Sequence, residues 1–287
     1  MARRRDSNPV RELLRLPVGK PVDLSAYDAA ATPGSPPGGK AAGIAATARM
    51  GEDLADLQER LWAAATAGDR RRLLLVLQGP DASGKGGTVK HVIGRFNPAG
   101  CRIHAFKAPT RQERHHDFLW RVEKALPRPG EIGVFDRSHY EDVLIAKVHS
   151  HASDDEIDRR YGRINAFEDR LSDSGVTLVK CFLHLSREEQ CRRLLKRLDK
   201  PDKHWKFDPG DLDERARWPA YRQAYETAFS RCATSAAPWY LIPADHKWYR
   251  DWAVSSLLLE HLRELDPRYP KAGFDVRECR QRLLREG

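Results

Sequence analysis

The chain has 287 residues and carries 50 Lys and Arg against 41 Asp and Glu, a formal net charge of +9. This length suits one large α/β domain or two small ones, and the charge favours polyanionic partners, although a basic surface can also serve solubility alone. The sequence lacks an apolar run long enough to span a bilayer and a signal-peptide core, and its five scattered cysteines show no zinc or disulfide spacing. We therefore expect a cytoplasmic protein with reduced thiols and no membrane partner.

The first segment, residues 1 to about 48, begins with three arginines at positions 3–5 and passes through a Pro- and Gly-rich stretch at 32–40. This composition is typical of an extended or partly disordered arm. We expect residues 49–287 to form a single domain, which starts with an amphipathic helix marked by Leu54, Leu57 and Leu61.

An aliphatic run at residues 73–77 predicts a buried strand, and a G-x-x-x-x-G-K motif follows from Gly79 to Lys85. Such a loop turns backbone N–H groups toward phosphate oxygens, and the helix that follows directs its positive end to the same place. The alternative is a glycine-rich strand–helix turn with an ordinary surface lysine. The residues that we expect to bind phosphate here are Gly79, Ser83, Gly84, Lys85, Gly86, Gly87, Thr88 and Lys90.

Two positions depart from the usual phosphate loop. Gly86 replaces the Ser or Thr whose hydroxyl normally helps to hold Mg²⁺, and Asp81 puts a carboxylate inside an anion-binding loop. A divalent cation that bridges Asp81 to phosphate resolves the conflict.

A second short strand is expected at 102–107 and a helix with Phe118, Val122 and Leu126 after it. The stretch 131–136 then predicts a strand that ends at Asp136. Ligands bind at the carboxyl ends of parallel strands, so Asp136 is a second candidate for the metal. The alternative is that Asp136 caps a helix running through Lys147.

Further along, we expect a helix over 157–171, a strand over 176–185 and a helix that begins at Ser186 with a capping box. This helix and the loop after it are rich in cations, which predicts a lid over about 192–217 that clamps phosphoryl groups; a solvated basic face is the alternative. The cations of this region that we single out are Arg193, Arg197, Lys203 and Lys206. Trp205 could stack on a base or serve packing.

The remaining pattern predicts a helix over 212–232, a strand over 239–242 and a helix over 248–265. Five strands that alternate with helices predict a three-layer α/β/α sandwich with a five-stranded parallel sheet.

Several motifs together resemble polyphosphate kinase family 2. They are residues 79–88, 135–144, 189–206, 237–240 and 244–249. The resemblance implies a P-loop kinase fold similar to thymidylate kinase and phosphoryl transfer between inorganic polyphosphate and purine nucleotides, AMP to ADP, ADP to ATP, or both. It further implies Mg²⁺ as cofactor, with Mn²⁺ as an alternative, and a homo-oligomer, either a dimer or a tetramer.

The same resemblance implies metal roles for Asp81 and Asp136, phosphate contacts for Lys85 and Arg137, and lid contacts for Arg193 and Arg197. It places Glu141 among the nucleotide-binding residues. The segment 138–142 resembles members that accept AMP, but Asp136 is often Asn in those members, so the acceptor stays open among AMP, ADP and guanine nucleotides.

Two other functions remain open at this point. One is an ATP-dependent nucleotide kinase on the same scaffold. The other is a non-catalytic polyanion-binding module, against which the joint presence of Asp81, Lys85 and Asp136 argues. The sequence shows no RNA-binding signature, so we do not expect nucleic acid as a partner.

Overall fold

The computed structural model describes residues 9–286 and contains one five-stranded parallel sheet. The strands are β1 (Arg72–Gln78), β2 (Cys101–Ala105), β3 (Ile132–Asp136), β4 (Val176–His184) and β5 (Trp239–Pro243). Their spatial order is β2-β3-β1-β4-β5, so the phosphate-loop strand β1 is central. In register, Leu77 of β1 lies beside Asp136 of β3, which brings the two motifs to one edge of the sheet.

Strand β1 alternates its side chains between the two faces of the sheet. Leu73, Leu75 and Leu77 face a core with α2 (Gly39–Ala65) and α10 (Lys247–Leu265). Leu74 and Val76 face the opposite core. Because both faces are covered, the strand is a continuous apolar run instead of an alternating one.

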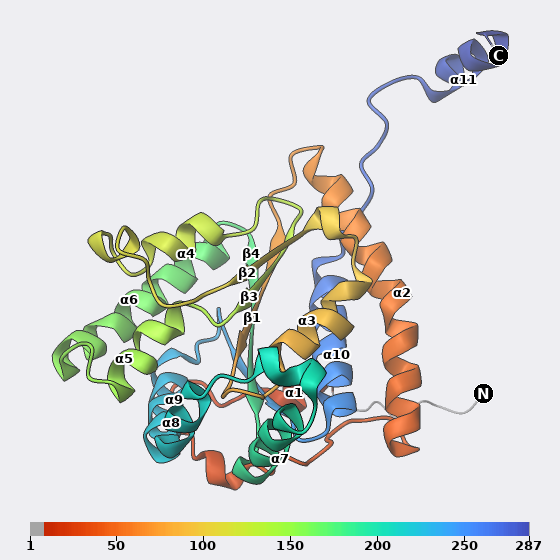
Figure 1. Cartoon of the computed structure of the whole chain (residues 1–287). Helices are drawn as coiled ribbons and strands as arrows, with labels where there is room; N and C mark the ends of the chain where they lie inside the picture. Colours follow the sequence, from red (N-terminus) through yellow and green to blue (C-terminus); the bar gives the residue numbers. More distant parts are fainter. Residues whose placement is uncertain (1–8, 287) are drawn as a thin grey trace.

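Helices cover both faces of the sheet (Figure 1). The helix α3 (Lys85–His91) lies with α2 and α10 on one side. The other side carries α4 (Trp120–Ala125), α5 (Ile145–Val148), α6 (Asp154–Asp173) and α9 (Trp218–Cys232). The predicted three-layer fold is therefore confirmed.

The lid region lies beyond the carboxyl ends of the strands (Figure 1). It consists of α7 (Arg187–Leu198), a 3₁₀ turn (Pro201–Lys206) and α8 (Gly210–Ala216). Ser186 caps α7 as predicted, since its Oγ accepts a hydrogen bond from the Glu189 N–H at 3.1 Å. The single helix expected over 212–232 is instead two, α8 and α9, which meet at Arg217 where Pro219 follows in the first turn of α9.

The N-terminal segment differs from the expectation of an extended or partly disordered arm. Residues 9–38 form α1 (Val10–Leu14) and a packed strap beneath the sheet, and α2 already begins at Gly39 (Figure 1). The strap is held by buried apolar side chains at Leu14, Leu16, Val22 and Leu24. The Pro- and Gly-rich composition of this segment did not predict that these four side chains are buried. Residues 1–8, with the three arginines, lie outside the described part.

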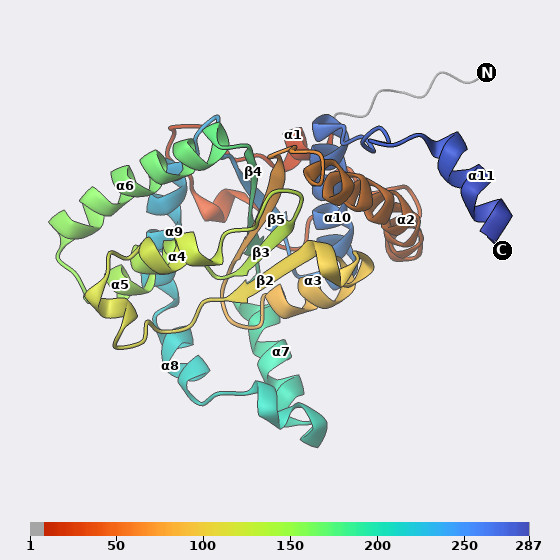
Figure 2. The ribbon, with the colours of Figure 1, turned by 90° about the horizontal axis from the view of Figure 1, so that it is seen from above.

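The last helix, α11 (Val276–Glu286), stands apart from the body in both views (Figures 1 and 2), and all of its side chains are exposed. Among the described residues, no helix combines the length and the apolar character that crossing a bilayer requires.

Candidate active site

The loop between β1 and α3 has the backbone shape of a phosphate cradle. Gly79 and Gly84 have φ angles of 151° and 109°, and the non-glycine Ala82 adopts 64°. A Cβ on Gly84 would lie 1.8 Å from Nη1 of Arg250, and one on Gly87 would lie 2.9 Å from Nη2 of the same residue. The positive φ therefore favours glycine at position 84, and a side chain there would also have to displace the Arg250 guanidinium.

Lys85 starts helix α3 and is buried against the loop. Its Nζ donates hydrogen bonds to the carbonyl oxygens of Gly79, at 2.7 Å, and Pro80, at 3.3 Å. Burial lowers the pKa of Lys85, and the negative charges of Asp81 and Asp136 oppose that shift. The ammonium thus lies in the field of both predicted metal-binding carboxylates.

Asp81 and Arg137 connect the loop to the end of β3. Arg137 Nη2 donates to Asp81 Oδ1 at 2.9 Å, and Arg137 itself adopts a φ of 64°. A left-handed conformation costs a non-glycine residue free energy, and such strain concentrates at functional sites. Asp136 is the last residue of β3, and Ser138, not Asp136, caps the following turn. The alternative of Asp136 as a helix cap is therefore wrong.

Buried polar groups hold the turn that follows Arg137 in place. Ser138 Oγ accepts a hydrogen bond from Gln78 Nε2 at 3.0 Å, which joins this turn to the end of β1. Glu141 lies on the same turn, and burial raises the pKa of its carboxyl while Arg137 and Lys85 oppose the shift.

Arg193 of α7 reaches back to the phosphate loop. Its guanidinium donates to the carbonyl oxygens of Ala82 at 2.9 Å and Ser83 at 3.1 Å, and of Ala244 at 2.6 Å. Gln190, one turn earlier, donates through Nε2 to the Asp81 carbonyl oxygen at 3.0 Å. The lid helix is thus tied to the loop, and Arg193 acts as a tether between them.

On one side of the loop lies a basic cavity of about 310 Å³. Its cationic lining comes from the lid and from the start of α10, namely Arg193, Lys196, Arg197, Lys203, Lys206, Lys247 and Arg250. The neighbouring Arg193 and Lys196 act with burial to lower the pKa of Lys247, burial being the larger cause. A bound anion would relieve this repulsion between neighbouring cations.

On the other side lies a cavity of about 290 Å³ with the opposite character, which we call the acidic cavity. Its polar lining is mainly carboxylate, from Asp81, Glu141, Asp208, Asp211 and Glu214, together with Arg137, Gln190 and Arg215. Trp218, Tyr221 and Tyr225 add an aromatic wall. Burial raises the pKa of the Asp211 carboxyl, and the charge of Asp81 adds to that shift.

The structure brings most of the predicted site residues to this one edge of the sheet. Gly79, Asp81, Arg137 and Glu141 line the acidic cavity, and Gly84, Gly87, Arg193, Arg197, Lys203 and Lys206 line the basic one. Gly86 and Lys90 are exposed and line neither cavity. The other predicted residues that line neither cavity are Ser83, Lys85, Thr88 and Asp136. Trp205 is 78% exposed, so it does not serve packing within the described chain.

Sequence reasoning missed Arg250, Lys247 and the three aromatic residues of α9. Arg250 is only 2% exposed, and its Nε and Nη2 donate to Asp251 Oδ1 at 2.9 and 2.7 Å. The cations that follow the last strand at the start of α10 were a usable signal. The aromatic residues of α9 were not, because their spacing is that of an ordinary packed helix.

Whether a divalent cation fits can be judged from the side chains present. The described residues contain no cluster of three or more His, Cys, Asp or Glu able to hold a metal alone. Mg²⁺ typically uses one or two carboxylates and takes the remaining ligands from phosphate and water, which Asp81 and Asp136 match. The hydroxyls of Ser83 and Thr88 are buried without a hydrogen-bond partner among the described residues, so the loop has unused polar groups for a phosphate or its metal.

Comparison with known proteins agrees with this geometry. The chain is 44% identical over 251 residues to the AMP/ADP-polyphosphate phosphotransferase of Meiothermus ruber, covering 88% of this chain and 89% of the relative. It is 40% identical over 250 residues to the ADP-polyphosphate phosphotransferase of Rhodopseudomonas palustris, covering 82% and 85%.

A crystal structure of polyphosphate kinase 2 from Arthrobacter aurescens matches with a TM-score of 0.93 at 48% identity, over 98% of both chains. The family model "Polyphosphate kinase 2 (PPK2)" matches residues 40–270. The chain therefore belongs to the polyphosphate kinase 2 family.

Proposed function

We propose that this protein transfers phosphoryl groups between inorganic polyphosphate and purine nucleoside mono- or diphosphates, converting AMP to ADP, ADP to ATP, or both. The observation that carries the proposal is the pair of cavities on either side of one phosphate loop, one lined by cations and the other by carboxylates and aromatic rings.

The basic cavity suits the donor. Polyphosphate is a repeating anion without an apolar part, and side chains such as Arg197, Lys203 and Lys206 offer it charge along a track. The lysines bind phosphate as point charges, whereas the arginine can bind two oxygens at once.

The acidic cavity suits the acceptor, which brings a nucleoside as well as phosphate. Carboxylates repel a bare phosphate, but Asp81 and Asp136 would hold Mg²⁺, or Mn²⁺ in its place. That cation would supply charge neutralisation between the two polyanions. Guanine nucleotides are further candidate acceptors.

The chain's own residues supply positioning and charge. A nucleotide phosphate is already ionised near neutral pH, so the attacking oxygen needs little help from a general base. Lys85 and Arg137 hold the phosphates where negative charge gathers, and the tether through Arg193 keeps the lid over the loop. We further propose that the enzyme is cytoplasmic and works as a homo-oligomer. Its five cysteines are free, as expected for a reducing compartment.

The test is product chromatography after incubation with polyphosphate, Mg²⁺ and AMP, ADP, GMP or GDP in turn. We expect Asp81→Ala, Lys85→Ala and Asp136→Ala each to lower kcat/KM by at least ~100-fold, since each removes charge stabilisation at the reacting phosphates. Lys271→Ala, at an exposed lysine outside both cavities, is the matched control and should stay near wild type.

The rival functions give different results in the same assay. Transfer from ATP but not from polyphosphate would identify an ATP-dependent nucleotide kinase. Polyphosphate binding without transfer to any nucleotide would identify a polyanion-binding module. Full activity in all three variants would overturn the assignment of the site.

A further inference from the structure

A third cavity, of about 370 Å³, lies where the N-terminal strap crosses the carboxyl edge of the sheet. We call it the strap pocket. It shares four lining residues with the acidic cavity, namely Pro80, Trp218, Tyr221 and Tyr225. The two spaces therefore adjoin each other around the same aromatic wall of α9, next to the phosphate loop.

The strap is fixed in place as a wall of this pocket. His184 Nε2 lies 3.0 Å from the Tyr27 carbonyl oxygen, and the Asp245 N–H donates to the Ala29 carbonyl oxygen at 3.1 Å. Burial lowers the pKa of His184, so at neutral pH the ring is uncharged and can donate its Nε2 proton to that oxygen. The Leu24 N–H also donates to Glu226 Oε1 of α9 at 2.9 Å. Hydrogen bonds from the end of β4, from the turn after β5 and from α9 thus hold the backbone of the strap, so this wall is organised before any ligand binds.

The lining combines flat apolar surfaces with a polar rim. Tyr27, Phe182, Trp218, Tyr221 and Tyr225 contribute aromatic rings, and the rim carries Ser25, Asp28, Arg187, Glu188 and Arg222. Pockets of this kind bind a small planar ligand through its faces and orient it through a few polar groups. Polyphosphate has no such face, so the donor does not fit this chemistry.

We propose that the strap pocket binds the purine base of the acceptor nucleotide while its phosphates occupy the adjoining acidic cavity. This inference rests on the proposed function and extends it, because it makes residues 24–29 part of the acceptor site. The aromatic rings stack on the base, and the rim carboxylate of Asp28 offers an acceptor to its N–H groups.

The experiment is to obstruct the pocket from the strap. Ser25 is exposed and lines the pocket, so Ser25→Trp adds an indole at the entrance without disturbing the core. We expect KM for AMP to rise at least ~10-fold, KM for polyphosphate to stay within about 2-fold, and the melting temperature to hold. Tyr27→Ala, which removes one stacking wall, should raise the same KM.

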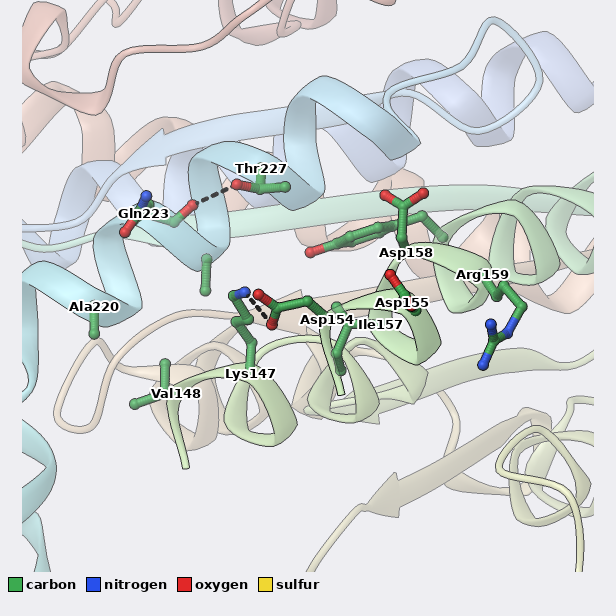
Figure 3. A pocket seen from close by; sticks show the side chains of 12 residues that line it. Lys147, Val148, Asp154, Asp155, Ile157, Asp158, Arg159, Ala220, Gln223 and Thr227 are labelled. Atoms are coloured by element: carbon green, nitrogen blue, oxygen red, sulfur yellow. Dashed lines mark hydrogen bonds and ion pairs between the residues drawn. The ribbon is translucent and has the colours of Figure 1, made fainter. Parts of the chain in front are cut away.

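A matched control uses a separate cavity of about 680 Å³ between α6 and α9 (Figure 3). It is lined by Ala220 on the same helix as Trp218, has an acidic rim of Asp154, Asp155 and Asp158, and shares no lining residue with the strap pocket. Ala220 is exposed, so Ala220→Trp adds an equal bulk there, and its KM for AMP should match that of wild type.

Adenosine separates base binding from phosphate binding. It should inhibit wild type competitively against AMP, and this inhibition should weaken at least ~10-fold in Ser25→Trp. If wild type transfers no phosphoryl group at all, the proposed function fails. If wild type is active but Ser25→Trp keeps both the KM for AMP and the inhibition by adenosine, the strap pocket is not the base site.

Discussion

Asp81 is a carboxylate placed in a loop whose backbone is shaped to attract anions. The structure pairs it with Arg137 at 2.9 Å, and both lie at the junction between the phosphate loop and the end of β3. The pair is partly exposed, so its contribution to the free energy of unfolding is small. The pair instead positions the site, because it holds two groups of opposite charge where phosphate and metal would meet.

The pKa of Lys85 leads to a prediction about pH. Burial lowers this pKa, so the ammonium loses its proton at a lower pH than an ordinary lysine, whose pKa is about 10.4. The expected result is that kcat/KM falls on the alkaline side as pH rises through this lowered value. Lys85→Arg keeps its charge and should move that limb to higher pH, even though its different shape reduces the rate.

The measurement is a profile of kcat/KM against pH for both proteins, with melting curves to confirm that each stays folded over the range. An identical alkaline limb in wild type and Lys85→Arg would show that another group titrates there.

The candidate site was predictable from sequence only where chemistry and spacing are local. Gly79 to Lys85 is a contiguous motif, and the strand before Asp136 delivers its carboxylate to the same sheet edge. Arg250 could not be found in this way, because its contact with Gly84 joins positions 166 residues apart in the chain. The lid arginines were recognised as cations, but their partners were not. Arg193 donates its hydrogen bonds to backbone carbonyl oxygens, and the pattern of charges in the sequence does not predict such partners.

At the scale of elements, α6 and β4 are joined by an ion pair buried away from both cavities. Lys180 Nζ donates to Glu168 Oε2 at 2.6 Å and to the Tyr140 hydroxyl at 2.8 Å, and Glu168 Oε1 also lies 3.1 Å from His139 Nε2. All four side chains are fully buried. Burial alone would raise the pKa of Glu168, but Lys180 and His139 outweigh it and lower that pKa.

Breaking this pair should be costly, because it leaves one buried charge without its partner. We expect Lys180→Met to reduce the free energy of unfolding by about 3–5 kcal/mol. The double variant Lys180→Met/Glu168→Leu should recover much of the loss, since both charges are then gone. Denaturant unfolding of the wild type and the two variants measures this, and a loss below ~1 kcal/mol in Lys180→Met would contradict the argument.

The elements themselves were largely predictable, because β1, β3, β4 and β5 are mainly apolar runs, although the edge strand β2 contains Arg102 and His104. The strap was not. Its anchors form two pairs, Leu14 with Leu16 and Val22 with Leu24, and each pair is too short to predict a strand. They are buried only because the assembled body offers them a surface. Tertiary contacts, not local pattern, order residues 9–38.

At the scale of the whole molecule, α11 projects from the body with an unpartnered apolar side. Val276, Leu283 and Leu284 are exposed by 55%, 71% and 67%. An amphipathic helix of this kind is seldom stable alone in water. We therefore expect it to pack against a second copy in the proposed homo-oligomer.

Removing residues 270–287 should lower the number of subunits per oligomer, measured as the molar mass from light scattering at a fixed protein concentration. Leu283→Asp in the full chain is the milder form of the same test, since it charges the apolar side without shortening the protein. An unchanged number of subunits in both variants would show that α11 does not join the copies.

The basic cavity and the acidic cavity have linings of opposite charge, and this difference also bears on how the enzyme keeps its two substrates apart. Both are polyanions, and a binding surface that merely attracted phosphate would admit either one at either place. In the proposed function, the phosphates of either substrate meet like charge at Glu141, Asp208 and Asp211. A nucleotide can offset that repulsion by stacking its base on the aromatic wall, whereas polyphosphate has no ring to stack and gains more from the basic cavity. If the cavities have the roles proposed here, the difference in their linings would sort donor from acceptor before any bond is broken, without a moving gate.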